Sequence, residues 1–118
     1  MKVPQVPKPP KGWDINNYIG NVARGAAWLD IHFPGWERKI NLETLNINLG
    51  DQCVCGQVVP REMVEAMDCY TGFGAVNQGL KDDNIMAHGF GSHTVHGDLW
   101  VSLIKERFDS GYLSDNAQ

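Results

Sequence analysis

The sequence lacks a long apolar run: no stretch of its 118 residues approaches the roughly 18–20 apolar residues that a membrane-spanning helix needs. Its first residues carry prolines where a signal peptide has its apolar segment. Cysteine is scarce, and an odd set of three, Cys53, Cys55 and Cys69, is a poor basis for a disulfide framework. We therefore expect a cytoplasmic protein that makes no contact with a membrane.

A surplus of basic residues is also absent. Lys and Arg number 10 against 14 Asp and Glu, which gives a formal net charge of −4 at pH 7. Proteins that coat nucleic acids depend on excess cations facing the phosphates, so general nucleic-acid binding is not expected. Dense carboxylate runs are missing too, because the longest acidic cluster is Asp82-Asp83, and this argues against a DNA mimic.

The composition that is present is that of a globular protein, with 42% hydrophobic and 20% charged residues. A chain of this length suffices for one domain with a real core. We predict a mainly α fold of two longer helices and several short ones, with any β structure small and peripheral. The predicted parts are a Pro-rich extended arm (1–12), the helical domain (13–111) and a polar C-terminal tail (112–118).

Two stretches have apolar residues at helical spacing. The first covers 14–32 with Asp14 as N-cap, and its apolar stripe is Ile15, Tyr18, Ile19, Val22, Ala26 and Leu29. We expect it to end before Pro34, because proline disfavours helical backbone in the preceding residue. Gly20 and Gly25 within it indicate a place where another backbone approaches closely. The second stretch covers 94–108, and its stripe is Val95, Leu99, Trp100, Leu103, Ile104 and Phe108.

The segments between these two helices predict shorter elements. We expect a turn of helix at 36–40, a one-turn helix at 41–45 capped by Asn41, and a short helix from Gln52 to Val58 or Val59 capped by Asp51. The alternation of Leu45, Ile47 and Leu49 leaves a short strand as the alternative there. An amphipathic helix is predicted at 61–71. Five glycines within twenty residues predict a Gly-rich loop over 72–93, helical at most around 85–88.

Residues that favour contact with a partner protein lie in the arm, at the element edges and in the Gly-rich loop. Prolines spaced Pro-x-x-Pro form an extended ligand, tryptophans beside glycines can act as exposed anchors, and loop histidines can make binding depend on pH. Packing inside the domain is the alternative for each tryptophan, and we place Trp28 and Trp100 in the core. The candidate partner-binding residues are Pro4, Pro7, Pro10, Trp13, Trp36, His88, Phe90 and His93.

A metal site is the second candidate. Cys53, Cys55, His93 and His96 have the side chains that tetrahedral zinc prefers. A single residue between two cysteine ligands makes a strained chelate, however, so buried cysteines are the favoured interpretation. We assign no metal or other cofactor, and no catalytic residue, because no motif of nucleophilic catalysis is present and Gly72-Phe73-Gly74 lacks the rest of a phosphate-binding loop.

The run Arg24–Trp36, followed by Ile40-Asn41-Leu42-x-x-Leu45-Asn46 and Cys53-Val54-Cys55-Gly56-Gln57-Val58, resembles small uncharacterised proteins of actinobacteriophages and their prophages. The similarity covers about a third of the chain and continues into His88-Gly89-Phe90 and a final helix bearing Trp100. It implies a phage source and a small helical fold, and it implies no activity. The family pattern has Leu where this chain has Cys55, which implies that Cys55 fills a hydrophobic slot. It also has Asp where Asn41 and Asn46 stand here.

We therefore expect a non-enzymatic phage accessory protein that binds a host or phage macromolecule, as an inhibitor or modulator, in the cytoplasm of the host cell. A minor virion component anchored by the N-terminal arm is one alternative. A small zinc-binding module or enzyme is the other. A protein partner is expected, and homo-oligomer formation is compatible with the sequence.

Overall fold

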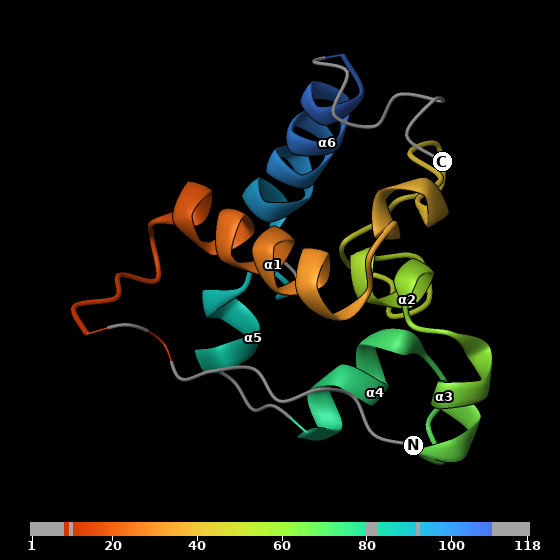
Figure 1. The fold of residues 1–118 in the computed structure, drawn as a ribbon. Coiled ribbons are helices and arrows are strands. Elements are labelled where there is room, and N and C mark those ends of the chain that lie inside the picture. The colour runs from red at the N-terminus through yellow and green to blue at the C-terminus, as the bar shows by residue number, and fades with distance from the viewer. Residues whose placement is uncertain (1–8, 10, 80–82, 92, 110–118) are drawn as a thin grey trace.

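A computed structural model of the chain describes residues 9, 11–79, 83–91 and 93–109 (Figure 1). Within these ranges all regular secondary structure is helical, and no strand forms at 45–49. This confirms the predicted mainly α fold. The elements in chain order are α1 (Tyr18–His32), the 3₁₀ helix η1 (Trp36–Lys39), α2 (Val54–Val58), α3 (Arg61–Ala66), α4 (Gly72–Gly79), α5 (Asp83–Ala87) and α6 (Thr94–Asp109). The tail 112–118 and the arm, apart from Pro9, Lys11 and Gly12, lie outside the described residues.

Helix α1 begins at Tyr18, four residues later than predicted. Asn17 is its N-cap, since the Asn17 Oδ1 atom accepts the Gly20 N–H at 3.1 Å. Asp14 instead accepts the Asn16 N–H at 2.9 Å in a turn before the helix. Both residues are good caps, and the segment before Tyr18 is held outside the helix by Asn21, which bonds to the Trp13 indole and to the Ile15 carbonyl oxygen. The helix ends at His32, as Pro34 predicts.

The segment after α1 is less helical than predicted. The turn of helix at Trp36 is confirmed as η1, but residues 41–45 form only a hydrogen-bonded turn, in which Asn41 Oδ1 accepts the Glu43 N–H at 2.9 Å. That side-chain bond competes with a helical turn. Helix α2 is preceded by Cys53 at the N-cap position, where Asp51 was predicted.

The predicted Gly-rich loop at 72–93 is wrong for its first part, which forms α4, whereas α5 covers the predicted helical stretch near Ile85. Ala75 and Val76 of α4 are fully buried. A Cβ atom added at Gly72 would lie 2.2 Å from the Cys55 carbonyl oxygen, so α4 packs on α2 at a distance that only glycine permits. Burial against α2 therefore outweighs the weak helix propensity of the glycines.

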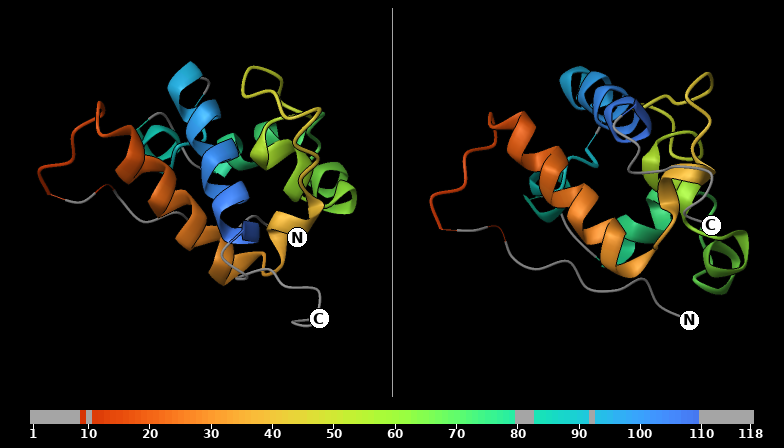
Figure 2. Two further views of the ribbon diagram at one scale, coloured as in Figure 1. Left: turned by 90° about the horizontal axis from the view of Figure 1, so that it is seen from above. Right: turned by 45° about the horizontal axis from the view of Figure 1, so that its top comes forward.

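One side of the core lies where α1 packs against α6 and against the segment between α5 and α6 (Figure 2), and the other side lies where α2 packs against α4. Phe90 stacks on Trp100 with ring centroids 5.9 Å apart, and Trp36 meets the edge of Trp100 at 5.6 Å. Trp28 and Trp100 are buried, as predicted. Gly25 is the predicted close approach, because a Cβ atom there would lie 2.0 Å from the His88 carbonyl oxygen.

Candidate functional site

Helix α1 is apolar on two sides. Its inner side places Val22, Ala26 and Leu29 in the core, each at most 2% exposed. Its outer side carries an unbroken series at four-residue spacing, Ile19, Ala23, Ala27 and Ile31, which we name the α1 apolar row. Ile19 and Ile31 are each 73% exposed. The predicted apolar stripe of this helix joined Ile19 to Val22 and Leu29, but Ile19 lies on the outer side, so that stripe combines residues from both sides of the helix.

The outer side of α1 carries no charged residue. Within this helix, all of which the structure describes, the exposed residues are the α1 apolar row and His32. Arg24 and Asp30 are half-buried and hydrogen-bonded to other elements. A surface helix normally presents polar and charged side chains to water, so an apolar outer side is a candidate contact surface.

A groove of about 220 Å³ runs beside the row, between α1 and α6. Ile19, Val22 and Ala23 line it from α1, and Leu99, Ser102, Leu103 and Glu106 line it from α6. A second groove of about 200 Å³ lies between residues 45–48 and the first turns of α6, and its lining includes the polar side chains of Asn46, Asn48, Thr94 and Asp98. Of these two grooves, the one beside α1 is continuous with an apolar surface.

Behind the N-terminal end of the row lies a buried polar cluster centred on Asn21. The Asn21 Oδ1 atom accepts hydrogen bonds from Trp13 Nε1 and Arg24 Nη2, both at 2.8 Å. Because both neighbours are donors, the orientation of the Asn21 amide follows, and its Nδ2 atom donates to the Ile15 carbonyl oxygen at 3.2 Å and to His96 Nε2 at 3.3 Å. Asn21 is thereby fully engaged.

These contacts assign the protonation of His96. Its Nε2 atom accepts from Asn21, so its hydrogen is on Nδ1, which donates to the Gly91 carbonyl oxygen at 3.3 Å. Burial lowers the pKa of His96, and the neighbouring His93 acts in the same direction, so the ring is held neutral. Burial likewise lowers the pKa of His88, whose Nδ1 atom lies 3.0 Å from the Asn84 carbonyl oxygen.

His93 is half-buried at the start of α6. Its ring stacks on Tyr18 with centroids 4.5 Å apart, and its Nε2 atom lies 3.2 Å from Tyr18 Oη. Its Nδ1 atom accepts the Val95 N–H at 3.2 Å, which caps the helix. Both ring nitrogens of His93 and of His96 are thus used in contacts within the protein.

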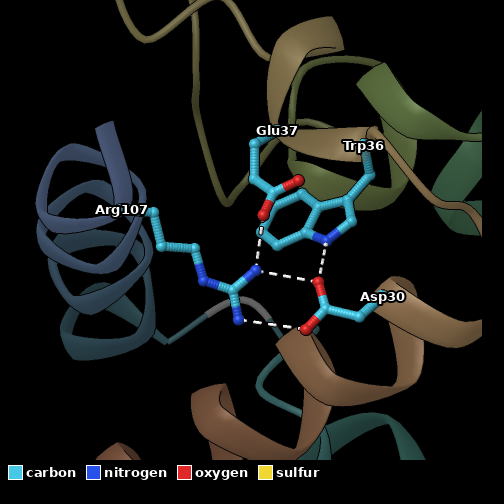
Figure 3. A network of polar contacts seen from close by, with 4 residues as sticks. All are labelled: Asp30, Trp36, Glu37 and Arg107. Carbon is cyan, nitrogen blue, oxygen red and sulfur yellow. Dashed lines mark hydrogen bonds and ion pairs between the residues drawn. The ribbon is translucent and has the colours of Figure 1, made fainter. Parts of the chain in front are cut away.

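At the C-terminal end of α1, Arg107 joins three elements (Figure 3). Its guanidinium donates to both carboxylate oxygens of Asp30 on α1, at 2.8 and 3.1 Å, and to Glu37 Oε2 on η1. The Trp36 indole N–H also donates to Asp30, at 3.0 Å. The two carboxylates hold the pKa of Arg107 above its ordinary value, although burial alone would lower it. Glu37 is 2% exposed, so Arg107 neutralises a charge inside the protein.

The structure corrects several predicted contact residues. Trp36, His88 and Phe90 are at most 3% exposed, so they offer no side-chain surface to a partner, because they pack between α1, α5 and α6. Trp13 is half-buried, and its indole N–H is bonded to Asn21. Pro4, Pro7 and Pro10 lie outside the described residues.

The four candidate zinc ligands are not brought together. Cys53 and Cys55 are buried at the start of α2 and His93 and His96 lie at the start of α6, and in the described part of the chain no three His, Cys, Asp or Glu side chains form a cluster suited to a metal ion. Burial raises the pKa of the Cys55 thiol, which disfavours the thiolate that zinc requires. Both cysteines pack as small apolar residues with Val54 and Val58.

The α1 apolar row has one signal in the sequence. Four apolar residues at strict four-residue spacing lie beside a separate apolar stripe on the same helix, and one helix facing a single core needs only one stripe.

Within the described ranges no helix is long and apolar enough to cross a bilayer. Comparisons of the chain with protein-family models, with curated proteins and with solved structures found no match.

Proposed function

We propose that the protein is a non-enzymatic phage accessory protein that binds another protein through the α1 apolar row and the groove beside it. The single observation that carries the proposal is the outer side of α1, where the exposed residues are the row and His32, and none is charged. The phage source rests on the resemblance of residues 24–58 to actinobacteriophage and prophage proteins.

The chemistry of the surface points to a helical partner. Two isoleucines, each 73% exposed, are large apolar anchors, and the two alanines between them let a second backbone come close. A partner helix with apolar side chains every third or fourth residue fits such a surface. Glu106 at the groove and His32 at the end of the row supply polar groups at the margin.

The state of the histidines favours binding over catalysis. His93 and His96 use both ring nitrogens within the fold, and the acceptor nitrogen of His96 faces the Asn21 amide. A general base needs a nitrogen within reach of its substrate. We therefore assign these side chains to the support of α1 and α6.

The test compares two matched double variants as tagged baits in a lysate of host cells that also produce the untagged wild-type protein, so that a host protein or a second copy can be captured. Ile19→Glu/Ile31→Glu places two charges on the row, and Leu49→Glu/Tyr70→Glu places the same charges at two exposed apolar residues elsewhere, which are 48% and 92% exposed. We expect a stoichiometric partner with the wild-type protein and with the second variant, and its loss with the first. A set of captured proteins that is the same for both variants would contradict the proposal.

A further inference from the structure

The α1 apolar row reads the same from either end. Its order is Ile19, Ala23, Ala27, Ile31, with large residues outside and small ones inside, and its midpoint lies at the level of Gly25. We propose that the row binds the same row of a second copy of the chain, antiparallel and about a two-fold axis. This inference rests on the proposed function, because it names the partner of the same surface.

An antiparallel copy matches large residues with large and small with small. The partner's Ile31 then lies opposite Ile19, and the partner's Ala27 opposite Ala23. The same contacts occur twice, as in every two-fold interface, so the assembly closes as a dimer and exposes no second row. A parallel copy would also oppose identical residues, but it would align the helix dipoles unfavourably.

Helix geometry agrees with this order of residue sizes. Residues at four-residue spacing form a ridge, and two such ridges pack with the helices crossing at about 50°. The helices are closest at the crossing, where Ala23 and Ala27 occupy little space. They diverge on either side, and there the longer side chains of Ile19 and Ile31 fill the widening gap.

The charge distribution of the chain favours a second copy over a charged partner. The chain carries a net charge of −4, so two copies repel each other in general. The outer side of α1 carries no charged residue, so along the row two copies meet without burying like charges, and Glu106 at the groove is exposed to water in the single chain. Antiparallel helices also place the positive N-terminal end of each α1 near the negative C-terminal end of the other.

The groove completes the contact. It begins at Ile19 and Ala23, so a side chain opposite Ile19 lies at its mouth. The partner's Ile31 occupies that position, and Leu99 and Leu103 of α6 offer it apolar walls within about 220 Å³. Two-fold symmetry fills both grooves in this way. Because a single helix pair makes a small interface, we expect the dissociation constant of the dimer to be roughly micromolar.

The first experiment is sedimentation of the purified protein over a concentration series. We expect the average mass to rise from 13.1 kDa toward twice that value with increasing concentration. Leu49→Glu/Tyr70→Glu should behave as the wild type, and Ile19→Glu/Ile31→Glu should stay at the mass of one chain. Circular dichroism checks that both variants keep the helical fold, which is expected because all four positions are exposed.

Cross-linking tests the antiparallel arrangement. Ile19→Cys and Ile31→Cys are prepared separately in a Cys69→Ser background, since Cys53 and Cys55 are each only 1% exposed. Mild oxidation should give a disulfide-linked dimer when the two proteins are mixed and little when either is alone. Efficient linkage of Ile19→Cys with itself would overturn the antiparallel arrangement.

The outcomes separate this inference from the proposed function. A wild-type protein that stays monomeric at every concentration while its row still captures another protein overturns the second copy and leaves the proposed function standing. A monomer whose row variants also capture the same proteins as the wild type overturns both. Self-association that both glutamate variants abolish, or neither does, overturns the placement of the contact on the row.

Discussion

At the scale of single residues, Asn21 shows how one amide can decide the state of its neighbours. It is fully buried, and its two polar atoms serve Trp13, Arg24, His96 and the Ile15 carbonyl. His96 lies 75 positions away in the chain. Asn21 is not among the predicted site residues, because a buried asparagine in a helix cannot be distinguished from a solvated one until its distant partners are known.

Replacing Asn21 with leucine should destabilise the protein strongly. The change keeps a side chain branched at Cγ and leaves the Trp13 indole N–H and His96 Nε2 without this partner inside the protein, so we expect the free energy of unfolding to fall by roughly 3 kcal/mol. Urea unfolding measures this change in the free energy of unfolding. Asn48→Ala, at an exposed position, should change the value by less than about 0.5 kcal/mol. Equal effects of the two substitutions would contradict the role of Asn21.

His96 should make the stability depend on pH. Burial holds its folded pKa below the value of about 6.5 expected in the unfolded chain, so the unfolded state binds more protons as the pH falls. The stability that neutral His96 contributes is complete above about pH 6.5 and is lost as the pH falls toward the folded pKa. His88 acts in the same sense.

Urea unfolding at a series of pH values from about 7.5 to 5 tests this dependence. The wild-type protein should lose stability on acidification, and His96→Gln should lose less. The control is His32→Gln, which removes an exposed histidine and keeps His96 in place. A His96→Gln profile parallel to that of the wild type would refute the assignment.

At the scale of elements, Gly25 determines how closely the α5–α6 segment passes α1. Gly25→Ala should destabilise the protein by about 2 kcal/mol or more, although alanine favours helices, because the new Cβ atom would lie 2.0 Å from the His88 carbonyl oxygen and 2.9 Å from the Trp100 ring. Gly74→Ala is the control within α4. There the nearest atom is Thr71 Oγ1 at 3.2 Å, and a change within about 1 kcal/mol is expected. Thermal unfolding measures the stability of both variants. A Gly25→Ala protein as stable as the wild type would show that α1 and the α5–α6 segment can move apart.

Arg107 connects α6, α1 and η1, and its removal should be costly. Arg107→Ala leaves Glu37, which is 2% exposed, without its counter-charge. Breaking such a pair costs several kcal/mol, and we expect roughly 2–4 kcal/mol here because Arg107 and Asp30 keep 20% and 31% of their side-chain surface exposed. Lys105→Ala, an exposed neighbour on the same helix, should cost less than about 0.5 kcal/mol. In urea unfolding, Arg107→Met/Glu37→Leu should be more stable than Arg107→Ala, and an Arg107→Ala protein of wild-type stability would contradict the role of the network.

The helices also show which local sequence signals were sufficient to predict them. Strong periodicity and Pro34 located α1 and α6 to within a few residues, and Ile85 marked α5. Helix α4 was missed because Gly72, Gly74 and Gly79 are poor helix formers, and the helix is held by burial of Ala75 and Val76 against α2. The turn at Asn41 was predicted as a helix because the same residue is a good helix cap and a good turn former.

At the scale of the whole molecule, self-association should appear in thermal unfolding. A protein that binds itself only when folded becomes more stable as its concentration rises. We expect the Tm of the wild type to increase by roughly 2–4 °C for each tenfold increase in concentration above the dissociation constant. The Tm of Ile19→Glu/Ile31→Glu should not depend on concentration, and that of Leu49→Glu/Tyr70→Glu should follow the wild type. A wild-type Tm that is independent of concentration would contradict the dimer.

The sequence by itself determined the helical class, the two long helices, the end of the first at Pro34 and the burial of Trp28 and Trp100. These features follow from local periodicity and from the backbone limits of proline, which need no knowledge of distant residues. Tertiary structure alone decided which apolar side of α1 faces the core. It also buried Trp36, His88 and Phe90, kept Cys53 and Cys55 apart from the histidines, and set the neutral state of His96. Each of these depends on contacts between residues far apart in the chain, and a one-dimensional pattern does not carry that information.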